Sequence, residues 1–131
     1  MDPRESAVLQ AGRGIEGNAN QGGKRQVTVI SREAFADVSA ELGAEIDPAW
    51  RRANFMLSGV DLRESRGRVL DFGGVRVRLA GETRPCEQMD DAFLGLRAAL
   101  SPNWRGGAYG EVLNDGAVAV GLEVGFVEER E

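Results

Sequence analysis

Residues 68–80 constrain the fold of this chain more than any other stretch. The segments "RVLDF" and "VRVRLA" flank the dipeptide Gly73-Gly74. Two β-prone runs separated by a two-residue glycine turn predict an antiparallel hairpin. In the second run apolar residues alternate with arginines, so one face of this strand is expected to be buried and the other solvated. The buried face consists of Val75, Val77 and Leu79, and the solvated face of Arg76 and Arg78.

Other segments predict further short strands and two main helices. The run "QVTVI" at 26–30 and the segment "NFMLSGV" at 54–60 predict strands. Ser31 as N-cap and Gly43 as stop bound a helix, and "DPAW" at 47–50 predicts another helical turn. A second apolar stripe predicts a helix over about 88–100. The two stripes consist of Phe35, Val38 and Leu42, and of Met89, Phe93, Leu96 and Leu100.

The C-terminal part predicts a second hairpin, in which "NDG" at 114–116 joins "AYGEVL" to "AVAVGLEVGF". Strands therefore outnumber helices, in agreement with a content of 18 glycines. A mostly β fold is expected, as a closed or nearly closed barrel with two or three short helices. The length of 131 residues fits a single domain over residues 1–131.

Composition excludes several classes of function. The chain has no histidine and one cysteine, which rules out Ser-His-Asp and Cys-His catalysis, histidine-bound zinc and CxxC redox chemistry. A net charge of −5 and few aromatic residues argue against nucleic-acid binding. No apolar run is long enough to span a membrane and no signal peptide is recognisable, so a cytoplasmic location is expected.

Cys86, the lone cysteine, lies in the polar segment "GETRPCEQMDD". Pro85 stiffens the preceding turn, and the start of the predicted helix together with Arg84 favours a thiolate. Glu87 and the following acidic residues oppose it, and a buried, inert cysteine is the alternative. One thiolate does not hold a bare metal ion, so any metal bound by Cys86 must bring its own ligands.

Two arginine-containing segments are candidate anion sites. In "NWRGGAYG" the glycines after Arg105 can turn backbone N–H groups towards one point, with the arginine as a clamp; an ordinary turn entering a strand is the alternative. In "WRRANF" the residues Arg51, Arg52 and Asn54 precede a predicted strand. Because 15 of the 16 basic residues are arginine, codon bias explains this abundance as well as anion binding does.

Taken in order, "RRANFMLSGVDL", "GRVLDFGGVRVRLAGETRPCEQMD" and "RGGAYGEVLNDGAVAVG" resemble the MOSC domain, named for the C-terminal region of molybdenum cofactor sulfurases. The resemblance covers about residues 14–125. Its most telling points are the R-x-N of Arg52 to Asn54, the G-V-D-L of 59–62, the pair Pro85-Cys86 and the R-G-G that begins at Arg105.

The resemblance implies a barrel-like β fold and a cysteine, here Cys86, that carries sulfur or ligates the molybdenum of a pterin cofactor (molybdopterin). It further implies that Arg52, Asn54, Arg84 and Arg105 hold that cofactor. Members of the family handle cofactor sulfur, as sulfurtransferases, or reduce N-hydroxylated compounds with electrons from partner proteins. An electron-donor or sulfur-donor protein is therefore an expected partner.

Two departures from the family pattern leave a different class of function open. Many relatives carry a glycine-aspartate-x-histidine segment near the start, where this chain has "GNANQGGKR". Many also carry Gly-Asp in the last strand, where this chain has Gly121-Leu122. A non-catalytic binding module that keeps the barrel and has lost the cofactor is therefore the alternative to a cofactor-binding MOSC domain.

Overall fold

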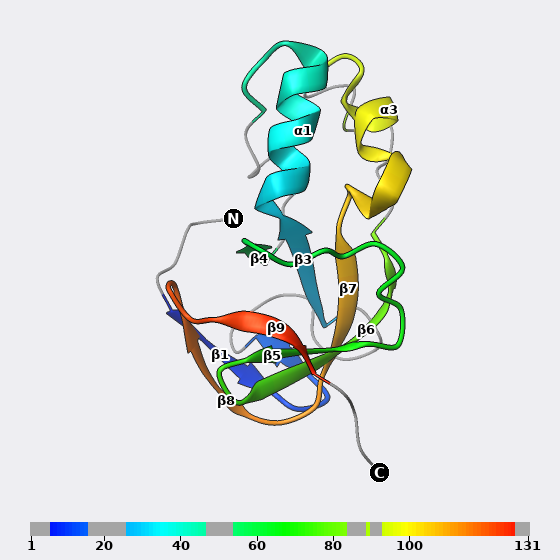
Figure 1. Cartoon of the computed structure of the whole chain (residues 1–131). Coiled ribbons are helices and arrows are strands. Elements are labelled where there is room, and N and C mark those ends of the chain that lie inside the picture. Colours follow the sequence, from blue (N-terminus) through cyan, green and yellow to red (C-terminus); the bar gives the residue numbers. More distant parts are fainter. Residues whose placement is uncertain (1–5, 16–25, 47–53, 84–88, 90–92, 128–131) are drawn as a thin grey trace. The chain divides into compact units, whose positions relative to one another are not determined.

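The structure is a computed structural model, and it describes residues 6–15, 26–46, 54–83, 89 and 93–127. Within these residues strands predominate, and the mostly β class is confirmed (Figure 1). The chain divides into two compact units that alternate along the sequence. The first comprises Met1–Val27, Ser65–Gly81 and Tyr109–Glu131, and the second Thr28–Glu64 and Glu82–Ala108. A single domain over 1–131 stays a prediction.

The strands belong to two hydrogen-bonded sheets. A three-stranded sheet has the order β2-β1-β8, and a six-stranded sheet has the order β4-β3-β7-β6-β5-β9. The strands are β1 (Ser6–Gln10), β2 (Gly14–Ile15), β3 (Val27–Ser31), β4 (Phe55–Leu57), β5 (Val69–Phe72), β6 (Val75–Glu82), β7 (Ala108–Val112), β8 (Gly116–Ala119) and β9 (Val124–Val127).

The hairpin predicted from residues 68–80 forms as β5 and β6. The strands pair antiparallel, with Val69 opposite Arg78 and Phe72 opposite Val75. Gly73 and Gly74 both have positive φ, as a two-residue hairpin turn requires. The apolar face of β6 is buried, with Val75 at 4% exposure and Val77 and Leu79 at 0%. The alternation of the sequence therefore determines which side of this strand enters the core.

The second predicted hairpin is wrong. Strands β7 and β8 lie in different sheets, because β8 pairs antiparallel with β1. The segment after the "NDG" turn thus finds its partner near the N-terminus, where Ala7 lies opposite Val118. Strand β9 in turn pairs with β5, with Leu70 opposite Phe126. A turn motif predicts a change of direction, but the partner of each strand depends on distant residues.

In the second unit, β3 leads directly into helix α1 (Arg32–Leu42), as predicted (Figure 1). The Oγ of Ser31 accepts a hydrogen bond from the Ala34 N–H at 3.2 Å, and Gly43 adopts the left-handed conformation at the C-terminus. Strand β4 pairs parallel to β3. The predicted helical turn at 47–50 lies outside the described residues.

The predicted helix over 88–100 is interrupted. Met89 is helical and its carbonyl accepts from the Phe93 N–H at 3.0 Å, but helix α3 begins only at Leu96 and runs to Leu100. Gly95, with a φ of 92°, separates the two pieces. The apolar stripe nevertheless packs against α1 as one cluster. That cluster contains Ile30, Phe35, Val38, Ile46, Met89, Leu96 and Leu100, with Leu42, Phe93 and Ala99 at its edge.

Candidate functional site

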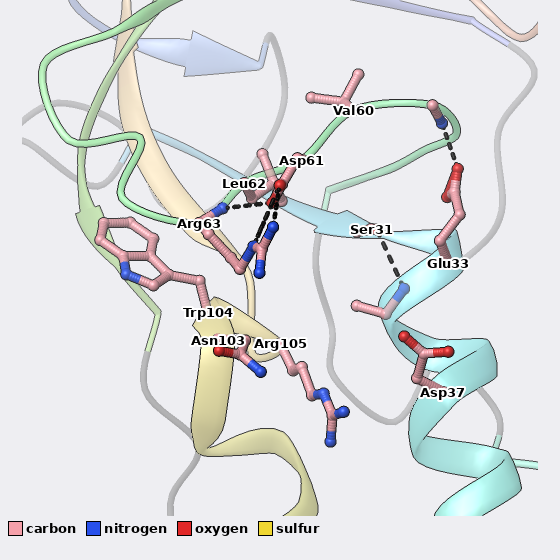
Figure 2. A pocket seen from close by; sticks show the side chains of 12 residues that line it. Ser31, Glu33, Asp37, Val60, Asp61, Leu62, Arg63, Asn103, Trp104 and Arg105 are labelled. Atoms are coloured by element: carbon pink, nitrogen blue, oxygen red, sulfur yellow. Dashed lines mark hydrogen bonds and ion pairs between the residues drawn. The ribbon is translucent and has the colours of Figure 1, made fainter.

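The candidate site can be traced only in part, because Arg52, Arg84 and Cys86 lie outside the described residues. Asn54 and Arg105 are described, and both belong to the second unit. The same unit holds a cleft of about 430 Å³. It is lined by the first turns of α1, the segment 59–63 and the 3₁₀ turn η2 (Pro102–Trp104) with Arg105 (Figure 2).

Asn54 joins the start of β4 to β3. Its Oδ1 accepts hydrogen bonds from the Thr28 N–H at 2.8 Å and from the Thr28 hydroxyl at 3.2 Å. Its own N–H donates to the Thr28 carbonyl at 3.0 Å. The side-chain oxygen of Asn54 is therefore already used in holding two parallel strands in register.

Arg105 is bound within the protein. Its Nη1 and Nη2 donate to the two carboxylate oxygens of Glu41 at 2.7 and 3.0 Å, and Nη1 also donates to the Ala99 carbonyl at 3.1 Å. The hydrogen bonds to Glu41 raise the pKa of Arg105, and the same bonds lower the pKa of Glu41. The guanidinium fork, which is the part that recognises phosphate, already holds a carboxylate.

The backbone N–H groups of Arg105 and Gly107 are used within the turn itself. The Arg105 N–H donates to the Pro102 carbonyl at 3.1 Å, and the Gly107 N–H donates to the Trp104 carbonyl at 3.0 Å. The Gly107 carbonyl accepts from the Thr83 N–H at 2.9 Å. These bonds are typical of a turn that enters a strand, which was the alternative interpretation of this segment.

Three carboxylates and two guanidiniums lie among the residues that line the cleft. Arg63 is the second guanidinium of its lining, and it is paired with Asp61 at 2.9 Å, which raises the pKa of Arg63. The Glu33 carboxylate accepts from the Gly59 N–H. Figure 2 shows the indole of Trp104 on the side of Arg63 and the guanidinium of Arg105 on the side of α1. The three carboxylates of the lining are those of Glu33, Asp37 and Asp61.

The backbone of the turn beside the cleft is strained. Asn103 and Trp104 have φ values of 56° and 59°, in the left-handed region that non-glycine residues rarely adopt. Such strain persists where surrounding contacts fix the conformation. This turn, Glu41 and the carboxylates of the lining were not predicted, because only "SPNWRGG" carries a local signal and it indicates no more than a break in the helix.

Of the residues expected to hold a molybdenum cofactor, the two that the structure describes, Asn54 and Arg105, are engaged within the protein. A pterin cofactor carries a phosphate and needs uncommitted cationic groups, whereas the fork of Arg105 is filled by Glu41. Within the described part of the chain, no group of three or more histidine, cysteine, aspartate or glutamate residues is arranged to hold a metal ion. The expectation that the chain binds the cofactor therefore depends on Arg52, Arg84 and Cys86.

Comparison with known proteins identifies the family. The MOSC domain matches residues 16–125. The chain belongs to the MOSC domain family. This confirms the resemblance inferred from the sequence, and the MOSC association with the molybdenum cofactor concerns the family as a whole. No curated protein sequence is significantly similar to the chain. Among the described residues, no helix is long and apolar enough to cross a membrane.

Solved MOSC proteins share the fold. YuaD from Bacillus subtilis is similar with a TM-score of 0.77 and 23% identity over 94% of this chain and 85% of that protein. YiiM from Escherichia coli is similar with a TM-score of 0.73 and 17% identity over 99% of this chain and 66% of that protein. YiiM from Geobacillus stearothermophilus is similar with a TM-score of 0.70 and 17% identity over 95% of this chain and 74% of that protein. At these identities the likeness establishes the MOSC fold alone.

Proposed function

We propose that this MOSC domain uses Cys86 to ligate the molybdenum of a pterin cofactor or to carry sulfur for it. The observation that carries the proposal is the family match over 16–125, which includes the one cysteine of the chain. A lone thiolate suits a metal that arrives already ligated, because further histidine or cysteine ligands are lacking in the sequence. A cytoplasmic location is part of the proposal.

The two branches differ in what Cys86 does. In the reductase branch, its thiolate is a ligand of molybdenum, and an electron-donor protein supports the reduction of an N-hydroxylated compound. In the carrier branch, the thiolate accepts sulfur from a donor persulfide. The donor S–S bond breaks, a new S–S bond forms at Cys86, and the donor leaves as a thiolate. Arg52 and Arg84 are the proposed cofactor-binding cations.

Metal analysis tests the first branch. The protein is co-produced with the cofactor pathway, purified, and its molybdenum content is measured beside that of Cys86→Ser. We expect near-stoichiometric molybdenum in the wild type and none in the variant.

For the carrier branch, exposure to a cysteine desulfurase is expected to add one sulfur to Cys86, measured as a mass increase that Cys86→Ser lacks. Failure of both experiments contradicts a role of Cys86 in molybdenum or sulfur chemistry.

One observation favours a second function, a binding module without cofactor. Both described candidates for cofactor binding have structural partners, since Asn54 is bound to Thr28 and Arg105 to Glu41. If the domain has lost the cofactor, molybdenum is absent from the wild type and from Cys86→Ser alike. The same result combined with no sulfur adduct supports the binding module.

A further inference from the structure

We infer that Arg105, the arginine of the R-G-G motif, is a positioning residue that fastens the turn at 101–107 to α1, and that it does not bind an anionic ligand. Its side chain is only 14% exposed, and its fork holds both oxygens of Glu41. Two parallel hydrogen bonds between a guanidinium and a carboxylate are among the strongest side-chain pairs. An anion would have to displace Glu41 to reach the same donors.

Arg105 also makes contacts at the C-terminal ends of two helices. Helix α1 has no basic residue in its last turn, and Glu41 lies in that turn. The guanidinium therefore neutralises the Glu41 carboxylate, whose negative charge is unfavourable at the end where the helix dipole is also negative. Ala99 belongs to the last four residues of α3, whose carbonyls have no partner within the helix, and its carbonyl accepts from Nη1. One side chain thus connects α1, α3 and the turn.

The connection explains how the strained turn is maintained. Asn103 and Trp104 immediately precede Arg105 and have positive φ. A backbone of this kind needs contacts that hold it on both sides. On the far side, a Cβ built on Gly107 would lie 2.2 Å from the Val29 carbonyl oxygen, so the backbone there packs directly on β3. On the near side Arg105 is tied to α1, and Trp104 is thereby fixed at the cleft.

The inference is tested with Arg105→Ala, Glu41→Ala and the double variant. Each is made in a Trp50→Phe background, so that Trp104 is the only tryptophan of the sequence. If the two residues act as a pair, the double variant lowers the thermal midpoint by less than the sum of the two single losses, and Arg105→Ala lowers it more than Glu41→Ala because it also removes the bond to the Ala99 carbonyl. All three variants also show the same red shift of Trp104 emission, because the turn is released from α1. Arg32→Ala and Glu45→Ala, exposed residues of the same unit, are the matched controls and leave emission unchanged.

A milder pair, Arg105→Lys and Glu41→Gln, replaces the alanine variants if these do not fold. Lysine cannot reproduce the fork, so we expect an intermediate midpoint and partial recovery of the Trp104 emission. Additive effects of the two sites overturn the inference. The inference is also overturned if Glu41→Ala leaves the thermal midpoint and the Trp104 emission unchanged while Arg105→Ala alone loses molybdenum. Midpoint and emission are measured without cofactor, so failure of the proposed function leaves this test intact.

Discussion

Asn54 illustrates how a motif residue can have a structural task. Its side-chain oxygen accepts hydrogen bonds from both the N–H and the hydroxyl of Thr28, so it links β3 to the start of β4. Because the pair is partly buried, removal of the acceptor leaves the Thr28 N–H without its partner. An unsatisfied donor of this kind costs about 1–3 kcal/mol.

We therefore predict that Asn54→Ala lowers the free energy of unfolding by about 1–3 kcal/mol, measured by urea denaturation. Asn54→Asp keeps an acceptor oxygen at the same place and is the matched variant, with a smaller expected loss. Equal stability of wild type and Asn54→Ala would show that the contact with Thr28 contributes nothing. The residue would then be available for the cofactor role that its motif implies.

Gly107 is required by two independent constraints. Its φ of 100° is unfavourable for any residue with a side chain, and a Cβ would approach the Val29 oxygen to 2.2 Å. Gly43 is the matched control, because it also has a positive φ, 65°, but nothing lies within 4 Å of its added Cβ. The difference between the two sites therefore reports the packing constraint together with the less favourable φ of Gly107.

Alanine at Gly43 is expected to cost about 1–2 kcal/mol, the usual cost of the left-handed conformation. Alanine at Gly107 is expected to cost about 1–3 kcal/mol more, because the overlap with a backbone oxygen forces β3 and the turn apart. Urea denaturation of the two variants measures the difference. Similar losses at the two positions would mean that β3 yields to the added methyl group.

At the scale of elements, the contact between α1 and the turn depends on pH. Glu41 has a lowered pKa in the folded protein because Arg105 donates two hydrogen bonds to it. A lowered pKa means that the bond stabilises the fold above the ordinary pKa of glutamate, about 4.3, and that this stabilisation is lost as the pH falls through the folded-state value. The carboxylate is 52% exposed, so salt reduces the effect.

Accordingly, Glu41→Gln is predicted to have a lower thermal midpoint than the wild type at pH 7, and the gap is predicted to close as the pH is lowered below about 4. Thermal scans of both proteins from pH 7 to pH 3 measure this convergence. Glu45→Gln, an exposed carboxylate four residues further on, is the control and should track the wild type throughout. A gap that stays constant with pH contradicts the ionic nature of the contact.

The elements that the sequence predicts well are those with local signals. Helix α1 carries its cap at Ser31, its stop at Gly43 and its apolar stripe in one contiguous stretch, and the β5–β6 hairpin carries its turn between its own strands. The partner of β8 is β1, more than 100 residues away, and no local pattern encodes that pairing. Strand β1 itself was not predicted, since "SAVLQ" lacks both a turn and a clear alternation.

In the candidate site, too, local sequence motifs are predictable and contacts between distant residues are not. The motifs of the sequence correctly indicate the family, because their order along the chain is a property of the sequence alone. The partner of Arg105 is 64 residues away, in the last turn of α1, where Glu41 looks like an ordinary exposed helix residue. Which groups are already engaged is therefore a property of the folded unit, and it decides whether an arginine can bind a ligand.

At the scale of the whole molecule, the order of the segments along the chain couples the unfolding of the two units. The chain passes between the two units at four points, after Val27, Glu64, Gly81 and Ala108. Neither unit can therefore unfold without affecting the connections of the other. If Ser65–Gly81 unfolds, the two segments of the second unit are joined by a loose loop in place of a fixed hairpin, and closing that loop costs conformational entropy.

This connectivity predicts a single cooperative unfolding transition, which core variants in either unit displace. Leu79 of the first unit and Leu100 of the second are both 0% exposed, so alanine at either position is expected to cost about 2–5 kcal/mol. Far-ultraviolet circular dichroism reports on the whole chain, and Trp104 fluorescence, in the Trp50→Phe background, reports on the second unit. We expect both signals to shift together for Leu79→Ala as well as for Leu100→Ala. If Leu79→Ala shifts the dichroism but leaves the Trp104 transition in place, the units unfold independently and the interleaved chain does not couple them.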